Sequence, residues 1–408
     1  MLKLIDVEQL RLGMYIHKLC GSWMDHPFWR GAFLLDNPKD MRAVLASGLR
    51  EVWIDTSKGL DVHPLPDETP AVEATSSITP PVQTQAVSAA VPRVDAAQEA
   101  ARAVHICAHA KQAVASMFEE ARMGKALRGS DALEVVEEIS NSVLRNPSAL
   151  ISLARLKNKD DYTYMHSVAV CALMVSLARQ LGLDAEQVRQ AGLAGLVHDI
   201  GKMMIPAEIL NKPGKLTDAE FTLIKTHPAE GHKLLQRGSD ICEVALDVCL
   251  HHHEKINGSG YPKRLTGDQM SLYAKMGAVC DVYDAVSSNR AYKNAWEPAE
   301  SLRRMAEWRN GHFDQRVFDA FVKSIGIYPV GSLVRLESNH LGVIIEQTEK
   351  SLLNPMVKVF FSIKSNSRIP AEIVDLSKPQ CREKIVSHES AEQWGITDLK
   401  TLWSGVAT

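Results

Sequence analysis

The sequence of 408 residues predicts a mainly α-helical protein with a small α+β module at its N-terminus and a small β-rich appendage at its C-terminus. Three observations support this fold class. Apolar residues recur at helical intervals through most of residues 96–327, without the alternation of a parallel sheet. Short runs of β-branched residues lie on either side of this region, and a stretch rich in Pro, Ala, Ser and Thr precedes it. A chain of this length is expected to form roughly two or three domains.

The N-terminal module is expected over residues 1–62. Residues 15–17 and 52–54 carry β-branched and aromatic side chains, which is typical of short strands, and residues 38–46 between them favour a helix. Residues 63–95 lack periodicity and aromatic side chains, so they cannot bury enough surface to offset the entropy of ordering. We therefore expect a flexible linker there.

The helical region carries clear helix start and stop signals. Gly182 is placed to end one helix, and Asp184 is placed to cap the next, with Gln187 at the capping-box position. Thr217 and Glu220 form a second capping box. These signals divide the region into successive helices, which supports an all-helical domain.

The C-terminal region, residues 328–408, changes to a β pattern. Residues 333–336, 342–345 and 356–361 are rich in Val, Ile, Leu and Phe and predict strands. Residues 391–402 predict a short helix. We expect a small β-rich appendage that packs on the helical domain.

Composition and charge exclude several classes of function. The net charge near −3 gives no sign of a protein that binds nucleic-acid polymers. No apolar run reaches the length of a membrane span, and no signal-peptide pattern follows Met1. The seven cysteines are scattered and form no CxxC pair, which fits a reducing compartment. We therefore expect a cytoplasmic protein.

Histidine and aspartate side chains gather on the apolar faces of the expected helices. Each alone would mean little, but successive helices present one or two of them at positions that point inward. An aspartate within an apolar helix, such as Asp281, is costly to bury unless it is paired or bound to a metal. The pattern therefore predicts a metal centre formed by His166, His198, Asp199, His227, His252, His253 and Asp281.

The kinds of ligand indicate the kind of metal. Histidine with carboxylate and no cysteine suits iron or manganese, and zinc less well. The donors exceed the needs of one ion, so we expect two divalent metal ions bridged by Asp199, which would activate a water or hydroxide against a phosphodiester. Lys202 is placed to stabilise charge on the phosphate or on the leaving oxygen.

Two local expectations accompany this centre. Gly201 should end the helix that carries the His-Asp pair and let the chain turn sharply, which keeps Lys202 close to the centre. His227 should lie near the end of the helix that Thr217 caps.

The chain resembles the HD-GYP phosphodiesterases, a branch of the HD superfamily of metal-dependent phosphohydrolases, most firmly over residues 160–314. The resemblance rests on the His-Asp pair with Lys202, on the run 252–262 and on the block 281–293. It implies an all-helical HD-type domain that opens the bacterial second messenger cyclic di-GMP to pGpG, and it leaves open whether pGpG is cut further to GMP. Residues 1–62 resemble a small domain of unknown function that is often found ahead of such domains.

The resemblance implies roles for further residues. It implies the same seven metal ligands that are named above, and a catalytic role for Asp199 and Lys202. Glu254 is expected to anchor the loop that follows it rather than to take part in the chemistry. The resemblance implies substrate contacts at Asp160, Asp284, Arg290 and Lys293, and a loop wall beside the site formed by Gly258, Gly260, Tyr261 and Pro262.

Two positions depart from the family pattern. Tyr162 lies where some members carry a glutamate that helps to hold a third metal, so we expect two metals in this chain. Asn257 replaces the usual aspartate before Gly258, and asparagine tolerates the same turn geometry.

The sequence leaves alternatives to this activity open. The chain could be a receptor or scaffold that binds a cyclic dinucleotide or a protein without turnover, or an enzyme for another cyclic dinucleotide. The N-terminal module could regulate the enzyme or mediate dimerisation. Besides cyclic di-GMP, we therefore consider a homodimer or a signalling-protein partner.

Overall fold

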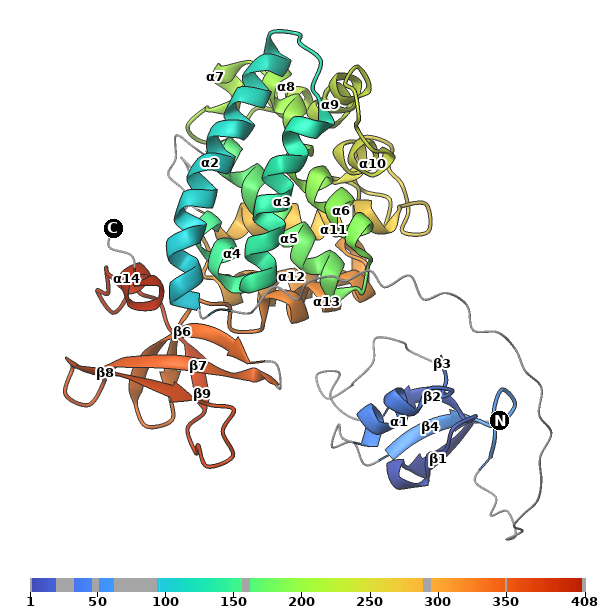
Figure 1. Cartoon of the computed structure of the whole chain (residues 1–408), viewed down its shortest axis with the longest axis vertical. Helices are drawn as coiled ribbons and strands as arrows, with labels where there is room; N and C mark the ends of the chain where they lie inside the picture. The colour runs from blue at the N-terminus through green and yellow to red at the C-terminus, as the bar shows by residue number, and fades with distance from the viewer. Residues whose placement is uncertain are drawn as a thin grey trace, which may run out of the picture. The chain divides into compact units, whose positions relative to one another are not determined.

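The computed structural model describes residues 2–19, 33–45, 51–61, 94, 96–155, 162–288, 295–348 and 351–405. The chain divides into two compact units, residues 1–88 and 89–408. Figure 1 labels most of the elements of both units, and each unit is described by itself below. The expected linker, residues 63–95, lies outside the described residues apart from Val94.

The N-terminal unit is a four-stranded antiparallel sheet with one helix, α1 (Pro38–Leu45), packed against it. Alternate strand residues point to one face, where Ile16, Val52 and Ile54 pack with Val44 of the helix. The expected α+β character is confirmed, with β1 and β3 as additional strands. In the sheet order β1-β4-β2-β3, the strands are β1 (Leu2–Asp6), β2 (Tyr15–Leu19), β3 (Phe33–Leu34) and β4 (Glu51–Asp55), and a 3-10 helix, η1 (Val7–Gln9), follows β1.

The second unit is built from helices that surround α5 (Tyr162–Gln180). Every residue from Met165 to Ala178 is buried, because α4, α6, α11 and α13 pack around this helix. A helix that is hydrophobic on all sides is stable only when it is buried, which explains the central position of α5. The other helices are α2 (Ala96–Arg122), α3 (Gly129–Arg145), α4 (Pro147–Arg155), α6 (Ala185–Val197), the 3-10 helix η3 (Ile200–Met204), α7 (Ala207–Leu210), α8 (Asp218–Ile224), α9 (His227–Gln236), α10 (Glu243–His251), α11 (Leu272–Ser287), α12 (Pro298–His312) and α13 (Gln315–Ile325).

The expected helix boundaries are confirmed at two places. Gly182 follows α5 in the left-handed conformation, at a φ of +76°. Asp184 and Gln187 exchange two side chain–backbone hydrogen bonds, so a full capping box begins α6. Thr217 and Glu220 form the same reciprocal box at the start of α8.

Two local expectations are wrong. Helix α6 ends at Val197, so His198 caps it and Gly201 lies beyond it in η3, without a positive φ. Glycine is needed there for a close approach instead, since a Cβ at Gly201 would lie 2.0 Å from the His227 carbonyl oxygen. His227 is the first residue of α9 rather than a late residue of α8, because Pro228 favours the start of a new helix.

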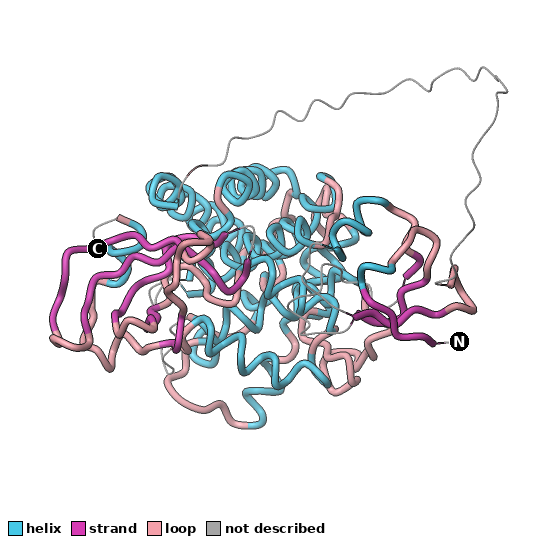
Figure 2. Tube along the Cα trace, turned by 90° about the horizontal axis from the view of Figure 1, so that it is seen from below, coloured by secondary structure: helices cyan, strands magenta, loops and turns pink. Residues whose placement is uncertain are grey.

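The C-terminal region forms a five-stranded antiparallel sheet in the order β8-β7-β6-β5-β9. Figure 2 shows these strands beside the helices of the same unit. The hydroxyl of Ser152 in α4 donates to the Val330 carbonyl oxygen (3.1 Å), and α14 packs against α2, so the sheet is tied to the helical region. The elements are β5 (Leu333–Leu336), β6 (His340–Thr348), β7 (Ser351–Ser362), β8 (Ser367–Asp375), β9 (Ile385–His388) and α14 (Leu399–Ser404).

The sequence predicts β5, β6 and β7 but not β8 and β9, whose residues are mostly exposed or half-buried. The helix expected over residues 391–402 is shorter, because residues 391–395 form a turn that Gly395 ends at a φ of +63°, and α14 begins at Leu399. The mainly α-helical class with small sheets near both ends is confirmed. Among helices in the described ranges, none has both the length and the apolar content to cross a bilayer.

Substituting Gly201 by alanine should destabilise the helical region. The added methyl group would lie 2.0 Å from the His227 carbonyl oxygen and 2.4 Å from the Gly231 amide nitrogen, both backbone atoms. Overpacking costs about 1–3 kcal/mol, which urea unfolding would measure as a lower free energy of unfolding. Met204→Ala, at a half-exposed position of the same 3-10 helix, should change this free energy by less than about 0.5 kcal/mol. Equal unfolding midpoints for Gly201→Ala and the wild type would contradict this role of the glycine.

Candidate metal centre

Five parts of the second unit bring seven side chains together in one place. All are buried except His253, which is half-buried. They are the seven side chains that the sequence suggests as metal ligands: His166 from α5, His198 and Asp199 from the end of α6, His227 from the start of α9, His252 and His253 from the end of α10, and Asp281 from α11.

Four of the histidine rings are held from behind through Nδ1. His166 bonds through this atom to the carboxylate of Asp284, at 2.6 Å. Carbonyl and carboxylate oxygens accept, so Nδ1 carries a proton in each ring, and Nε2 is the atom that faces the centre and can bind a metal once it carries no proton. The other acceptors are the backbone carbonyl oxygens of Gly195 for His198 (2.8 Å), Ile224 for His227 (2.7 Å) and Val248 for His252 (3.0 Å).

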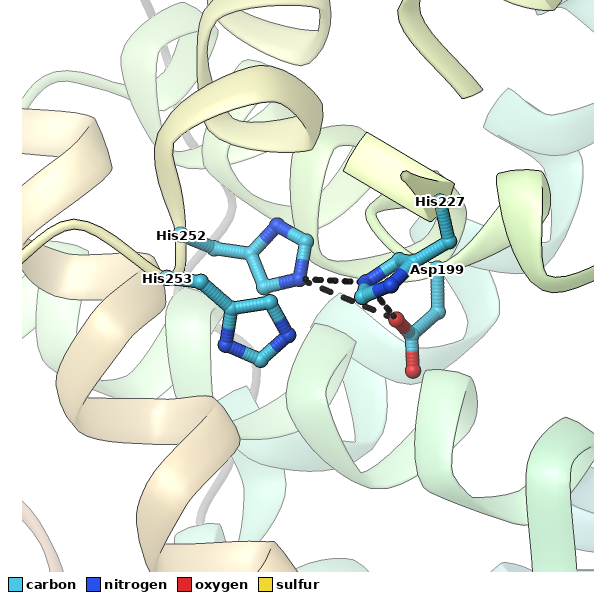
Figure 3. A group of neighbouring side chains, drawn as sticks. All are labelled: Asp199, His227, His252 and His253. Carbon is cyan, nitrogen blue, oxygen red and sulfur yellow. Dashed lines mark hydrogen bonds and ion pairs between the residues drawn. The ribbon is translucent and has the colours of Figure 1, made fainter. Parts of the chain in front are cut away.

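One group of donors comprises Asp199, His227, His252 and His253, whose ligand atoms all lie within 4.8 Å of one another. Figure 3 shows the Asp199 carboxylate beside the rings of His227 and His252. Nε2 of His227 lies 3.2 Å from Oδ1 of Asp199 and 3.4 Å from Nε2 of His252. Two nitrogen lone pairs at this separation are stable only with a cation or a proton near them, so the geometry favours a bound cation.

A second group comprises His166, His198 and Asp199, again with ligand atoms within 4.8 Å of one another. Nε2 of His166 lies 3.3 Å from Oδ2 of Asp199 and 3.3 Å from Nε2 of His198. Asp281 places Oδ1 at 3.0 Å from Nε2 of His166, and Oδ2 at 3.6 Å from Nδ1 of His253. Asp199 therefore belongs to both groups, with one oxygen facing each.

The two carboxylates at the centre are stable as anions. Burial opposes the charge of Asp199, but Lys202 and His198 outweigh burial and hold the pKa of Asp199 well below its usual range. Burial also opposes the charge of Asp281, and a hydrogen bond from His166 more than compensates, so the pKa of Asp281 is well below its usual range too. Both side chains are therefore negative at neutral pH.

The histidines differ in charge. Burial lowers the pKa of His252 to about 3 and lowers that of His253 as well, with added repulsion from a neighbouring histidine in each case. Burial also opposes protonation of His166, but hydrogen bonds to three aspartates, Asp199 first, raise the pKa of His166 to about 9. The neutral rings of His252 and His253 are the form that binds a metal.

The donors fit divalent metal ions. Oδ1 of Asp199 is buried and accepts no hydrogen bond within the described part of the chain, whereas buried polar atoms normally have a partner. A cation between this oxygen and the facing histidine nitrogens would satisfy it. The residues that could hold ions are Asp199 with His227, His252 and His253, and Asp199 with His166, His198 and Asp281.

Lys202 lies at the edge of the centre, in the 3-10 helix η3. Its backbone N–H donates to the Asp199 carbonyl oxygen (2.9 Å), and its ammonium forms an ion pair with Oδ2 of Asp199. The Lys202 side chain is 18% exposed. Its ammonium therefore lies beside the shared carboxylate and is partly open to solvent.

The loop after His253 forms one wall of the centre. Glu254 is fully buried and accepts backbone hydrogen bonds from Lys263 (2.6 Å) and Leu265 (3.0 Å), so its side chain anchors the loop. The ring of Tyr261 packs against that of His253 at an interplanar angle of 30°, with the ring centroids 4.7 Å apart. This contact limits the movement of the half-buried ligand.

Two positions of this loop require glycine for different physical reasons. Gly258 has a φ of +75°, which glycine adopts without strain. The preceding side chain, Asn257, accepts a hydrogen bond from the Ser259 N–H (3.0 Å) and so forms the turn without a charge. A Cβ at Gly260 would lie 2.4 Å from Cα of Glu254. Pro262 is exposed at the outer side of the wall.

Asp284, which was expected to contact substrate, lies behind His166 instead. It is 2% exposed, and its carboxylate holds Nδ1 of His166. We therefore assign it to orienting a ligand rather than to contacting substrate. Asp160, Arg290 and Lys293 lie outside the described residues.

The sequence did not predict which groups hold Nδ1 of the four histidine rings, or that the end of α12 supports the loop wall. Backbone acceptors leave no sequence signal, whereas Asp284 lies one turn after a suggested ligand on α11, and this spacing could have revealed its role. The N–H groups of Ile256 and Asn257 donate to the carbonyl oxygens of His312 (3.3 Å) and Gly311 (3.2 Å) at the end of α12. The loop wall is therefore supported by a helix that follows it in the chain.

Comparison with known proteins agrees with this arrangement. A family described as a domain of unknown function (DUF3391) matches residues 2–132, and a family described as an HD domain matches residues 139–317. A cyclic di-GMP phosphodiesterase of Pseudomonas aeruginosa is 56% identical over 408 residues, which cover 100% of this chain and 97% of the relative.

Two further relatives match only in part. A cyclic di-GMP phosphodiesterase response regulator of Xanthomonas campestris is 42% identical over 148 residues, 36% of this chain and 39% of its own length. A 3′3′-cGAMP-specific phosphodiesterase of Vibrio cholerae is 38% identical over 170 residues, 41% of this chain and 38% of its own length. With one relative similar along the whole chain and the HD match enclosing all seven side chains of the centre, this chain belongs to the HD-GYP family of HD-domain phosphodiesterases.

Proposed function

We propose that this chain is a metal-dependent phosphodiesterase that hydrolyses cyclic di-GMP to pGpG, with a second cut to GMP left open. The observation that carries the proposal is the buried carboxylate of Asp199, which two groups of histidines share. The relatives at 56% and 42% identity are named for cyclic di-GMP, which supports the choice of substrate.

The residues of the centre have distinct parts in this reaction. Bound divalent ions supply Lewis-acid chemistry and lower the pKa of a water. Asp199 and Asp281 hold the cations, because both carboxylates are ionised at neutral pH. Lys202 stabilises negative charge that develops on the phosphate or on the leaving oxygen. The ring of Tyr261 packs against that of His253 and covers one side of it.

Two metal ions per chain, iron or manganese, are part of this proposal. The ligands provide nitrogen and oxygen and no sulfur, which suits these metals. Tyr162 stacks on His166 with ring centroids 5.7 Å apart, where a third ion would need a carboxylate. The phenol offers no such negative ligand at neutral pH.

A second candidate is hydrolysis of another cyclic dinucleotide, because the Vibrio cholerae relative is named for 3′3′-cGAMP. A receptor or scaffold would bind the nucleotide without product.

We also propose a cytoplasmic location, since the cysteines of the described residues are unpaired, as in a reducing compartment. The N-terminal module is proposed to mediate a homodimer or contact with a signalling-protein partner.

Asp199→Asn should remove most of the activity. The substitution keeps the side-chain volume but removes the negative charge that both donor groups share. We expect kcat/KM for cyclic di-GMP to fall by at least about a hundredfold, measured by chromatographic separation of cyclic di-GMP, pGpG and GMP. Asp131→Asn, at an exposed position of α3, should keep the wild-type rate.

Three outcomes of this assay would change the proposal. Full activity in Asp199→Asn would overturn the role of the shared carboxylate. Tight binding of cyclic di-GMP by the metal-loaded wild type, without product, would favour the receptor alternative. Turnover of 3′3′-cGAMP in preference to cyclic di-GMP would favour the second candidate.

Metal analysis by mass spectrometry should find two ions per chain in protein loaded with iron or manganese. Removal by a chelator should abolish hydrolysis, and either metal should restore it. Tyr162→Phe keeps the ring that stacks on His166 and should bind the same number of ions. Three tightly held ions in the wild type would refute the dinuclear centre.

Asp284→Ala should weaken metal binding through its effect on His166. The ring would lose the acceptor at 2.6 Å that orients it, so we expect metal affinity to fall by about 10–100-fold, with kcat close to the wild type at saturating metal. Ser288→Ala is the control, because it removes only a 3.3 Å hydrogen bond to the other oxygen of Asp284. A higher KM for the nucleotide with unchanged metal affinity would instead support the substrate contact that the sequence suggested for Asp284.

A further inference from the structure

A line of aromatic and charged side chains runs along α12 toward the metal centre. Residues four positions apart lie on the same face of a helix, and four such residues of α12 continue from a tryptophan just before the helix. We call this set the α12 stripe, and it comprises Trp296, Glu300, Arg304, Trp308 and His312.

The two tryptophans and the arginine of the α12 stripe lie together. The guanidinium of Arg304 lies over the ring of Trp296, 4.3 Å from the centroid, and the rings of Trp296 and Trp308 are 5.9 Å apart. Glu300 accepts a hydrogen bond from Nε of Arg304 (2.6 Å) and so holds the guanidinium plane in place. Trp308 is 38% exposed. A flat base can stack on such an exposed indole beside an oriented guanidinium.

The end of α12 adjoins the wall of the metal centre. The carbonyl oxygens of Gly311 and His312 hold the N–H groups of Asn257 and Ile256. Ile256 lies three residues after His253, so their Cα atoms are at most about 11 Å apart.

Trp308 is close to this junction. It precedes His312 by one helical turn, about 6 Å along the axis. Burial and the charge of Lys255 lower the pKa of His312 to about 4, and the charge of Asp281 acts in the opposite direction. The backbone bonds to Ile256 and Asn257 place this end of the stripe beside the loop wall of the metal centre.

We propose that the α12 stripe binds a purine base of the cyclic dinucleotide whose phosphodiester group lies at the metal centre. This inference rests on the proposed function and adds a base-recognition surface to it. The metal ligands can hold only the phosphate part of the substrate, so the bases must contact other residues. Trp308 provides the stacking face, and Arg304 provides a second planar group with positive charge.

A structural role for the stripe would give different results from a base-binding role. The bonds between α12 and the loop wall use backbone atoms of Gly311 and His312. Removing the side chains of Trp308 or Arg304 therefore leaves these bonds in place. Arg303 is a matched control for Arg304, because its guanidinium also bonds to Glu300, whereas the guanidinium over the Trp296 ring is that of Arg304.

The test compares Trp308→Ala, Trp308→Phe, Arg304→Ala and Arg303→Ala in the full-length, metal-loaded protein. The substrates are cyclic di-GMP and methyl p-nitrophenyl phosphate, a phosphodiester without a purine. Trp308→Ala should raise KM for cyclic di-GMP about tenfold or more, and Arg304→Ala should raise it in the same direction. Hydrolysis of the small phosphodiester should stay within about twofold. Trp308→Phe should recover most of the loss, and Arg303→Ala should match the wild type.

Each other outcome has a definite meaning. An unchanged KM in Trp308→Ala overturns the inference, and an equal loss on both substrates shows that the side chain acts through the wall of the centre and also overturns it. Calorimetric binding of cyclic di-GMP to wild type and Trp308→Ala separates this inference from the activity. If the wild type binds cyclic di-GMP but forms no product, only the proposed activity is refuted. If both proteins bind it equally well, the base-binding role of the α12 stripe is refuted.

Discussion

The buried negative charge of Asp199 is the interaction on which the rest of the centre depends. A carboxylate without access to water is unfavourable unless cations and hydrogen-bond donors surround it. In this chain those groups come from separate helices, with Lys202 one turn away and histidines on both sides. The helices must therefore meet at this carboxylate, and their packing and the geometry of the donors cannot vary independently.

Close backbone crossings make this meeting possible. The place where a Cβ of Gly201 would stand is taken by the backbone of α9, and a Cβ at Gly231 would lie 2.7 Å from the sulfur of Cys249 in α10. Segments that cross without side chains between them approach more closely than ordinary helix pairs. As a result the rings of His227 and His252 meet beside the same carboxylate oxygen.

The sequence could predict what depends on local patterns. Capping boxes at Asp184 and Thr217 and the kinds of residue in the metal centre are of this type. It could not predict the reason for Gly201, because a contact between distant backbones leaves no periodicity, and its local reading as a helix stop was wrong. The role of Asp284 behind His166 likewise depends on how α11 packs against α5. The suggested contacts at Asp160, Arg290 and Lys293 stay predictions.

The acceptors behind the histidine rings lie at two very different separations along the chain. His198, His227 and His252 bond to carbonyl oxygens three or four residues before them, whereas His166 bonds to Asp284, 118 residues away. Three rings thus take their orientation from backbone that directly precedes them in the chain, and the fourth takes it from the packing of two helices. A small displacement of α11 against α5 would turn one ring and leave three in place. The centre therefore contains an intrinsic asymmetry, through which a change in the helical packing would weaken one metal position before the other.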